Sequence, residues 1–176
     1  MKLFLKGAPI FLLLLLFPFT KSFGQALKLS LQTGHAGPVQ KVTFDPSGRW
    51  LISSGDDQIL ILWDIKTGKQ VTSFGGHQGK ILDFVVHPSQ PWITSIDEHG
   101  RLLRTEYPSG QILEDLAYKP GMVNRLAYSS DGQDLLLAGV QVWKKPLNPT
   151  RELQKQTFPA QPIITALAIS PNKKYI

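Results

Sequence analysis

The fold is decided by residues 34–64, which read GHAGPVQKVTFDPSGRWLISSGDDQILILWD. Short apolar runs alternate here with turn sequences such as Asp45-Pro-Ser-Gly48 and Gly55-Asp-Asp57. A further run follows the Thr-Gly pair at residues 67–68. None of the runs is long enough to show the 3.6-residue period of a helix, so they predict strands. The four expected strands are Val39–Phe44, Trp50–Ser53, Ile59–Trp63 and Val71–Phe74.

The same pattern returns 42 residues later. Residues 34–68 align with residues 76–110 without a gap, and nine of the 35 positions are identical. A third copy contains Val123 and Ser129-Ser-Asp-Gly132, and a fourth begins at Ile164. Periods of about 40 to 45 residues are typical of propeller blades or helical arrays. Because each copy holds four short runs, the sequence predicts four-stranded antiparallel blades and an all-β propeller.

At Gly34-His35 and Trp63-Asp64 the first copy resembles the WD repeat, a family named after its closing Trp-Asp dipeptide. The second copy keeps Gly76-His77, Ser95 and Gly110 but has Thr105-Glu106 in place of Trp-Asp, and His99 in place of the turn aspartate. The third keeps Trp143 behind a shortened hairpin, and Tyr118-Lys119 replaces Gly-His. The resemblance extends over about residues 27–176. The repeats are expected at residues 35–76, 77–118, 119–160 and, in part, 161–176.

His35, Ser53 and Asp57 include the residue types of a hydrolase triad. The WD-repeat resemblance implies instead that they form a structural tetrad with Trp63, in which hydrogen bonds tie one blade together. Buried polar groups are costly unless they are paired, and a satisfied network fixes one arrangement. A hydrolase would also need an exposed nucleophile and an oxyanion hole. The second copy is expected to retain a partial tetrad, His77 and Ser95, and we expect no catalytic residues.

Metal and cofactor sites are not expected. The chain has no cysteine, which excludes disulfides and thiolate ligands. His77 and His99 occupy two tetrad positions of the second copy, but no third ligand is evident beside them, and His87 lies elsewhere in the blade. Structural metal sites usually need three or four ligands. The sequence also lacks a Gly-rich phosphate loop and a His-Glu-x-x-His motif.

A protein or peptide partner is expected at the face that the WD-repeat resemblance assigns to the loops flanking each first strand. Its mixture of apolar and polar residues suits such a contact. Lysines and arginines are scattered, which argues against a nucleic-acid groove. The expected face consists of Pro38, Gln40, Asp56, Lys80, Leu82, Glu98, Met122 and Asn124, with Ile163 and Thr165 from the fourth copy. A charged residue recurs at one inner-strand position, which makes Lys41, Asp83 and Arg125 candidates for lining a central channel.

The N-terminus has the pattern of a Sec signal peptide. Lys2 and Lys6 precede an uncharged stretch, Gly7–Thr20, which is shorter than the roughly 20 residues that span a bilayer. Cleavage is expected before Gln25, or after Ala26, and would leave no stable membrane anchor. It would reduce the net charge from +6 to +3, since three lysines and no acidic residue are removed. An uncleaved anchor and a buried core segment are the alternatives.

The domain organisation is therefore a signal peptide at residues 1–24 and a propeller region at residues 25–176. The alternating segment Leu27–Leu31 is expected to be a strand, and the WD-repeat resemblance implies that this strand completes the outer edge of the last blade. Only about three and a third blades are expected, whereas propellers close with four to eight. This predicts an N-terminal fragment of a longer, exported protein of bacterial type, periplasmic or extracellular. Assembly of blades between chains is the alternative.

The expected function is that of a non-catalytic scaffold for protein–protein interaction. Two alternatives stay open. The segment could be the recognition module of a larger enzyme with a caspase-like peptidase or kinase domain beyond residue 176. The propeller could instead bind a small molecule in its central channel.

Overall fold

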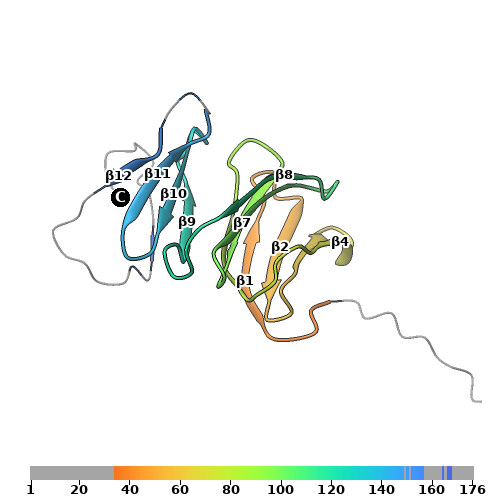
Figure 1. Cartoon of the computed structure of the whole chain (residues 1–176). Coiled ribbons are helices and arrows are strands. Elements are labelled where there is room, and N and C mark those ends of the chain that lie inside the picture. Colours follow the sequence, from red (N-terminus) through yellow and green to blue (C-terminus); the bar gives the residue numbers. More distant parts are fainter. Residues whose placement is uncertain (1–33, 149, 151, 157–163, 165, 168–176) are drawn as a thin grey trace, which may run out of the picture. The chain divides into compact units, whose positions relative to one another are not determined.

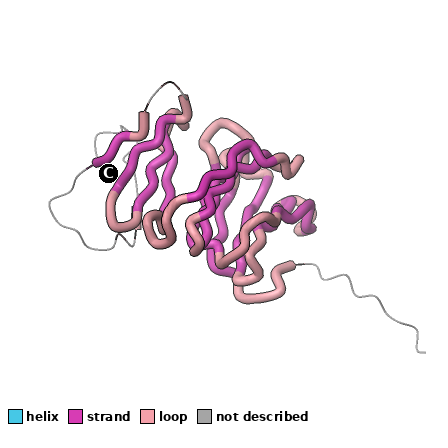
Figure 2. The backbone as a smooth tube through the Cα atoms, viewed as in Figure 1, coloured by secondary structure: helices cyan, strands magenta, loops and turns pink. Residues whose placement is uncertain are grey.

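The computed structural model describes residues 34–148, 150, 152–156, 164, 166 and 167. They form three four-stranded antiparallel sheets and contain no helix (Figures 1 and 2). We call the sheets blades 1, 2 and 3. Blade 1 contains β1 Val39–Phe44, β2 Trp50–Gly55, β3 Leu60–Asp64 and β4 Lys69–Phe74. Blade 2 contains β5 Ile81–Val86, β6 Trp92–Asp97, β7 Arg101–Glu106 and β8 Ile112–Ala117. Blade 3 contains β9 Arg125–Tyr128, β10 Asp134–Ala138, β11 Val142–Pro146 and β12 Gln154–Gln156.

Within each blade the strands lie in chain order, so that every connection is a hairpin between neighbours. The first hairpin shows how the sequence closes the turn. Asp45 accepts hydrogen bonds from Ser47 N and Trp50 N through its side chain, and Gly48 has a φ of +70° that favours glycine. Blade 3 repeats this turn with Ser129 in the aspartate's place and Gly132 at the same φ.

The core lies between consecutive blades. Ile52 and Leu60 of blade 1 pack with Phe84 of blade 2 in one cluster, and Leu102 of blade 2 packs with Leu126 of blade 3 in another. The inner strand of each later blade is therefore covered by the sheet that precedes it.

Equivalent positions on the inner strands differ in their exposure. Phe84 is 0% exposed, whereas Val42, at the same position of β1, is 56% exposed. The face of β1 that carries Val42 is thus a largely exposed apolar surface of blade 1.

The fold-class prediction of antiparallel four-stranded blades is confirmed, and each expected strand of the first repeat is present within one or two residues. Several other expectations fall outside the described residues. They are the signal peptide, the strand Leu27–Leu31, and most of the fourth repeat, including Ile163 and Thr165. Among the described residues, no helix has the length and apolar character to cross a membrane.

Candidate functional site

The structure brings the four residues of the expected blade 1 tetrad together. His35 Nδ1 donates to Asp57 Oδ1 at 2.9 Å, His35 Nε2 lies 2.7 Å from Ser53 Oγ, and Trp63 Nε1 donates to Ser53 Oγ at 2.8 Å. With the His35 proton on Nδ1, the Ser53 hydroxyl donates to His35 Nε2 and accepts from Trp63 Nε1, so that each hydrogen bond has one donor and one acceptor. The network links the loop before β1 to strands β2 and β3.

The environment of Asp57 favours its charged form. Burial alone would raise the pKa of this carboxyl group. The hydrogen bonds from the His35 ring and from Ala36 N outweigh that effect and hold the pKa below 3.8. Asp57 is therefore an anion that anchors the tetrad.

This geometry does not suit a hydrolase. Ser53 Oγ is already hydrogen-bonded to both Trp63 and His35, and Ser53 is only 3% exposed. A nucleophile needs access to a substrate carbonyl beside an oxyanion hole. The arrangement can hold β2, β3 and the preceding loop in register, but it offers no reacting group to solvent.

Blade 2 has a more complete network than the partial tetrad that the sequence predicts. His77 Nε2 lies 2.7 Å from Ser95 Oγ, and His77 Nδ1 donates to Asp97 Oδ2 at 3.0 Å. Burial is the main reason that the pKa of His77 is lowered, although Asp97 opposes it. His99, which the alignment places opposite Asp57, is exposed, so the carboxylate comes from a position two residues earlier.

A glycine explains this exchange of positions. Gly55 pairs with Val39 in blade 1, and Asp97 pairs with Ile81 in blade 2, so Gly55 and Asp97 are equivalent. A Cβ at Gly55 would lie 2.6 Å from His35 Nδ1. The bare backbone at position 55 lets the carboxylate approach from Asp57, whereas in blade 2 the residue at this position supplies the carboxylate itself.

The pair of histidines in blade 2 does not form a metal site. His77 uses both ring nitrogens in the tetrad-like network. Across the described residues, no group of three or more His, Cys, Asp or Glu side chains is placed to hold a metal ion.

Blade 3 departs further from the tetrad. Leu137 stands at the position of Ser53, since it faces Leu126 as Ser53 faces Val42. The shortened hairpin also moves Trp143, which pairs with Leu137, out of the register of Trp63. Lys145 takes that register position, and its Nζ donates to Glu114 Oε1 of blade 2 at 2.6 Å. An ion pair between blades thus replaces the tryptophan within the blade.

The residues of the expected partner face form a connected rim on blades 1 and 2. Asp56 Oδ1 accepts hydrogen bonds from Gln40 Nε2 at 2.9 Å and from Lys80 Nζ at 2.7 Å, and Asp56 and Lys80 are partly exposed. Lys80 N donates to Glu98 Oε1 at 3.0 Å, and Pro38 O accepts a hydrogen bond from Asp56 N. We refer to Gln40, Asp56, Lys80 and Glu98 as the rim. It is an exposed polar network that crosses from one blade to the next.

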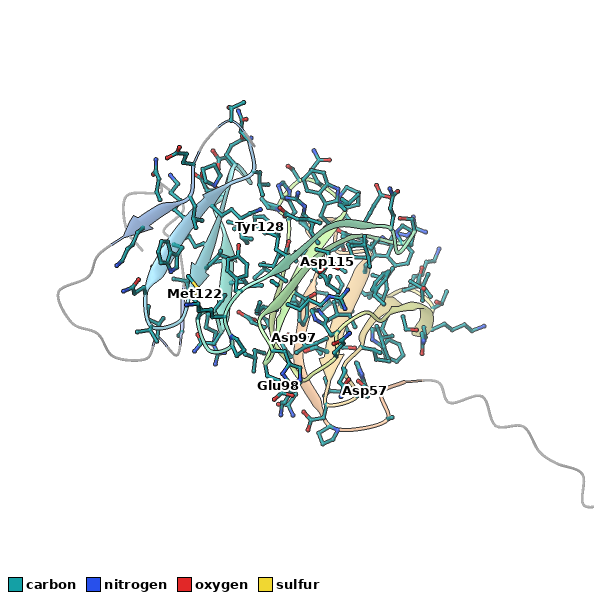
Figure 3. All side chains as sticks on the ribbon, in the orientation of Figure 1. Asp57, Asp97, Glu98, Asp115, Met122 and Tyr128 are labelled. Carbon is teal, nitrogen blue, oxygen red and sulfur yellow. The ribbon has the colours of Figure 1, made fainter. Side chains whose placement is uncertain are left out.

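Of the other expected face residues, Pro38 is exposed, and Leu82, Met122 and Asn124 are partly buried. Leu82 and Met122 pack against the core between blades 2 and 3. Asn124 is partly buried, and its Oδ1 has no hydrogen-bond partner. Glu98 and Met122 are labelled in Figure 3. Hydrogen bonds therefore link the expected face residues of blades 1 and 2. Leu82 and Met122 extend this face toward blade 3 with apolar side chains.

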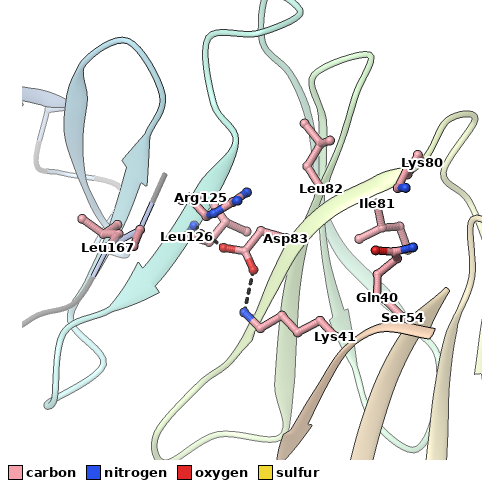
Figure 4. Close-up of a pocket in the computed structure, with 11 residues that line it drawn as sticks. Gln40, Lys41, Ser54, Lys80, Ile81, Leu82, Asp83, Arg125, Leu126 and Leu167 are labelled. Carbon is pink, nitrogen blue, oxygen red and sulfur yellow. Dashed lines mark hydrogen bonds and ion pairs between the residues drawn. The ribbon is translucent and has the colours of Figure 1, made fainter. Parts of the chain in front are cut away.

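The expected channel residues line a cavity of about 540 Å³ (Figure 4). Lys41 Nζ lies 2.5 Å from Asp83 Oδ1, and Asp83 Oδ2 accepts a hydrogen bond from Leu126 N at 2.8 Å. Lys41 also donates to Phe84 O at 2.7 Å, whereas Arg125 donates to the neighbouring Asn124 O. The Asp83 carboxylate thus joins the inner strands of all three blades, and its oxygens are used in doing so.

The repeat pattern agrees with the comparison with known proteins. Residues 27–64 and 68–102 match the WD40 family, described as "WD domain, G-beta repeat". These matches support a relationship between the matched residues and the WD-repeat family. The matched residues include all four strands of blade 1 and strands β5 and β6 of blade 2.

The names of curated relatives refer to WD repeats or to subunits of protein assemblies. The chain is 24% identical over 156 residues to target of rapamycin complex subunit wat1 of Schizosaccharomyces pombe, which covers 81% of this chain and 48% of that protein. It is 32% identical over 76 residues to WD repeat and FYVE domain-containing protein 2 of Caenorhabditis briggsae. This match covers 43% of this chain and 18% of that protein. It is 27% identical over 106 residues to eukaryotic translation initiation factor 3 subunit I of Neurospora crassa. This match covers 60% of this chain and 30% of that protein.

The chain spans less than half the length of these relatives. All three come from eukaryotes, so an exported protein of bacterial type stays a prediction.

Proposed function

We propose that this chain is a protein-interaction scaffold that binds a protein or peptide partner through the rim and its continuation toward Leu82 and Met122. The observation that carries the proposal is the exposed network of Asp56, Lys80 and Glu98, which crosses two blades on a rigid support. Exposed charges of both signs can meet complementary charges of a partner, which gives an interface specificity and orientation. Two of the relatives, a target of rapamycin complex subunit and an initiation factor subunit, are named as parts of complexes, in agreement with this role.

The support beneath the rim suits binding rather than bond chemistry. The tetrad of blade 1 lies next to Asp56, because Asp57 is its carboxylate. The equivalent network of blade 2 lies next to Glu98 through Asp97. Each rim acid is thus adjacent in sequence to a hydrogen-bonded carboxylate, which limits its backbone freedom and lowers the entropy that binding would cost.

Affinity capture from cells that produce the protein tests the proposal. Lys80→Glu replaces the rim cation, and Lys69→Glu makes the same charge change on the exposed start of β4 as a matched control. We expect wild type and Lys69→Glu to retain the same partner and Lys80→Glu to lose it, with unchanged circular dichroism spectra. Retention of that partner by Lys80→Glu would contradict the assignment of the rim.

Small-molecule binding in the cavity of Figure 4 is the less favoured function. The Asp83 carboxylate, which would be the natural acceptor for a ligand, already binds Lys41 and Leu126 N. A catalytic domain elsewhere in a longer polypeptide is compatible with the same scaffold role.

Export is a separate part of the proposal. We propose that residues 1–24 direct export and are removed, which leaves a mature protein without a stable membrane anchor. N-terminal sequencing of the mature protein is expected to begin at Gln25, or at Leu27 for the alternative cut. A chain that begins at Met1 in the cytoplasm would contradict it. We also propose that nucleic acid is not a partner, and gel-shift assays with single- and double-stranded DNA are expected to show no retarded species.

A further inference from the structure

His87 is a buried histidine that the tetrads do not use. It follows β5 and is 4% exposed. Its Nδ1 accepts hydrogen bonds from Ser89 N at 3.2 Å and Gln90 N at 3.0 Å. An atom that accepts two N–H groups carries the lone pair, so the ring proton is on Nε2. Nε2 then donates to Gly132 O of blade 3 at 3.0 Å.

The ring of His87 is also packed tightly between blades 2 and 3. It makes edge contacts with Trp92 of its own blade and Tyr128 of blade 3, with ring centroids 5.1 Å and 4.8 Å away. Gly132 has a φ of +70°, and a Cβ at this position would lie 2.3 Å from the His87 ring. The turn of blade 3 therefore approaches the ring as closely as its backbone allows.

We propose that His87 is a pH-sensitive pin between blades 2 and 3, which holds them together when neutral and releases them when protonated. A proton on Nδ1 would turn that atom into a donor facing the two N–H groups of Ser89 and Gln90. Both hydrogen bonds of the turn would be lost, and a charge would be buried. Movement of the ring to relieve this conflict removes the hydrogen bond to Gly132 and the contact with Tyr128.

The Gly132 carbonyl favours the charged form of His87, whereas burial and Arg104 disfavour it. Arg104 of β7 bears a positive charge, and its guanidinium group lies over the Trp92 ring at 5.2 Å. The Tyr128 hydroxyl of β9 is hydrogen-bonded to Thr94 Oγ1, and Asp131 of the facing turn accepts hydrogen bonds from Ser129 Oγ and Gln133 N. Burial lowers the pKa of His87 below 6.5, Arg104 lowers it further, and the bond to Gly132 opposes both.

The direction of the pH effect follows from linkage. The open junction exposes His87 with an ordinary pKa near 6.5, whereas the closed junction has the lower value. The open state therefore binds more protons in the window between these values. The closed junction is fully stable above about pH 6.5 and weakens as the pH falls toward the folded-state pKa of His87.

Hydrogen–deuterium exchange on the full chain tests the pin. At each pH, the exchange of amides in β9 and β10 is divided by that of β2 and β3 in the same sample, which cancels the chemical effect of pH. In wild type we expect this ratio to rise about three- to tenfold between pH 7.5 and pH 5. His87→Gln keeps an acceptor and a donor but does not titrate, so its ratio should stay constant. His99→Gln, a matched change at an exposed histidine, should behave as wild type.

A constant ratio in wild type, or a full rise in His87→Gln, would overturn the proposal. Nitrogen-15 NMR of wild-type His87 provides a second test that needs no variant. We expect the Nε2–H tautomer and a pKa below 6.5, with the exchange ratio levelling off near that pKa. An Nδ1–H tautomer, or a pKa at or above 6.5, would also overturn it.

Discussion

Asp97 of blade 2 occupies the register position that Gly55 holds in blade 1, and its Oδ2 accepts the hydrogen bond of His77 Nδ1 at 3.0 Å. Each of the two repeats thus pairs a buried histidine with a carboxylate, but the aligned positions that supply the carboxylate differ by two residues. We expect Asp97→Ala to lower the free energy of unfolding by about 3 kcal/mol, since a buried donor loses its partner. His99→Ala, at the aligned but exposed position, should change it by less than about 0.5 kcal/mol. Urea denaturation measures both, and equal losses would contradict the assignment.

The exchange should not transfer to blade 1, because a Cβ at position 55 would lie 2.6 Å from His35 Nδ1. Asp57→His removes the tetrad carboxylate, and adding Gly55→Asp places another carboxylate at the position that blade 2 uses. We expect the double variant to be less stable than Asp57→His alone by about 1–3 kcal/mol, since the added side chain displaces the His35 ring. If Gly55→Asp instead restores stability to Asp57→His in thermal denaturation, the glycine does not determine where the blade 1 carboxylate comes from, and this account of the exchange is wrong.

Asp57 should also make stability depend on pH in acid. Its folded-state pKa is held below the usual 3.8. Its contribution is fully present above about pH 4 and is lost as the pH falls through the lower folded-state pKa. We therefore expect the difference in unfolding free energy between wild type and Asp57→Asn to shrink from pH 5 to pH 2.5, as measured by urea denaturation. A difference that does not change with pH would show that the charge of Asp57 does not stabilise the tetrad.

The repeat pattern was sufficient to predict the blades, because turn residues and apolar runs are local signals. The resemblance to the WD repeat named all four residues of the blade 1 tetrad. It missed Asp97, since an alignment by sequence position places His99 opposite Asp57 and does not show how far a side chain reaches. The visible clue was the exchange of Gly55 and Asp57 for Asp97 and His99.

Contacts between blades could not be predicted from the sequence for a related reason. The recurrence of charge at Lys41, Asp83 and Arg125 predicted a shared inner position, but not that Asp83 would bind Lys41 and Leu126 N. In the same way His87 looked like an isolated histidine, because its partner Gly132 lies 45 residues away and contributes only a carbonyl.

The bridge at Asp83 should be important for stability. We expect Asp83→Ala to cost about 3 kcal/mol of unfolding free energy, because it leaves Lys41 without its anion and a buried N–H without an acceptor. The control is Asp115→Ala, which breaks an exposed ion pair with Arg101 and should leave the unfolding free energy nearly unchanged. Comparable losses in urea denaturation would mean that the bridge contributes no more than a surface pair.

The central claim is that the rim binds a partner. The most direct measurement is the affinity of the captured partner, by isothermal titration calorimetry, for wild type, Lys80→Glu and the control Lys69→Glu. We expect Lys80→Glu to raise Kd at least about tenfold, because the variant places two acids beside each other where a cation paired with Asp56, and Lys69→Glu to leave Kd unchanged. Equal Kd values for all three proteins would contradict the claim.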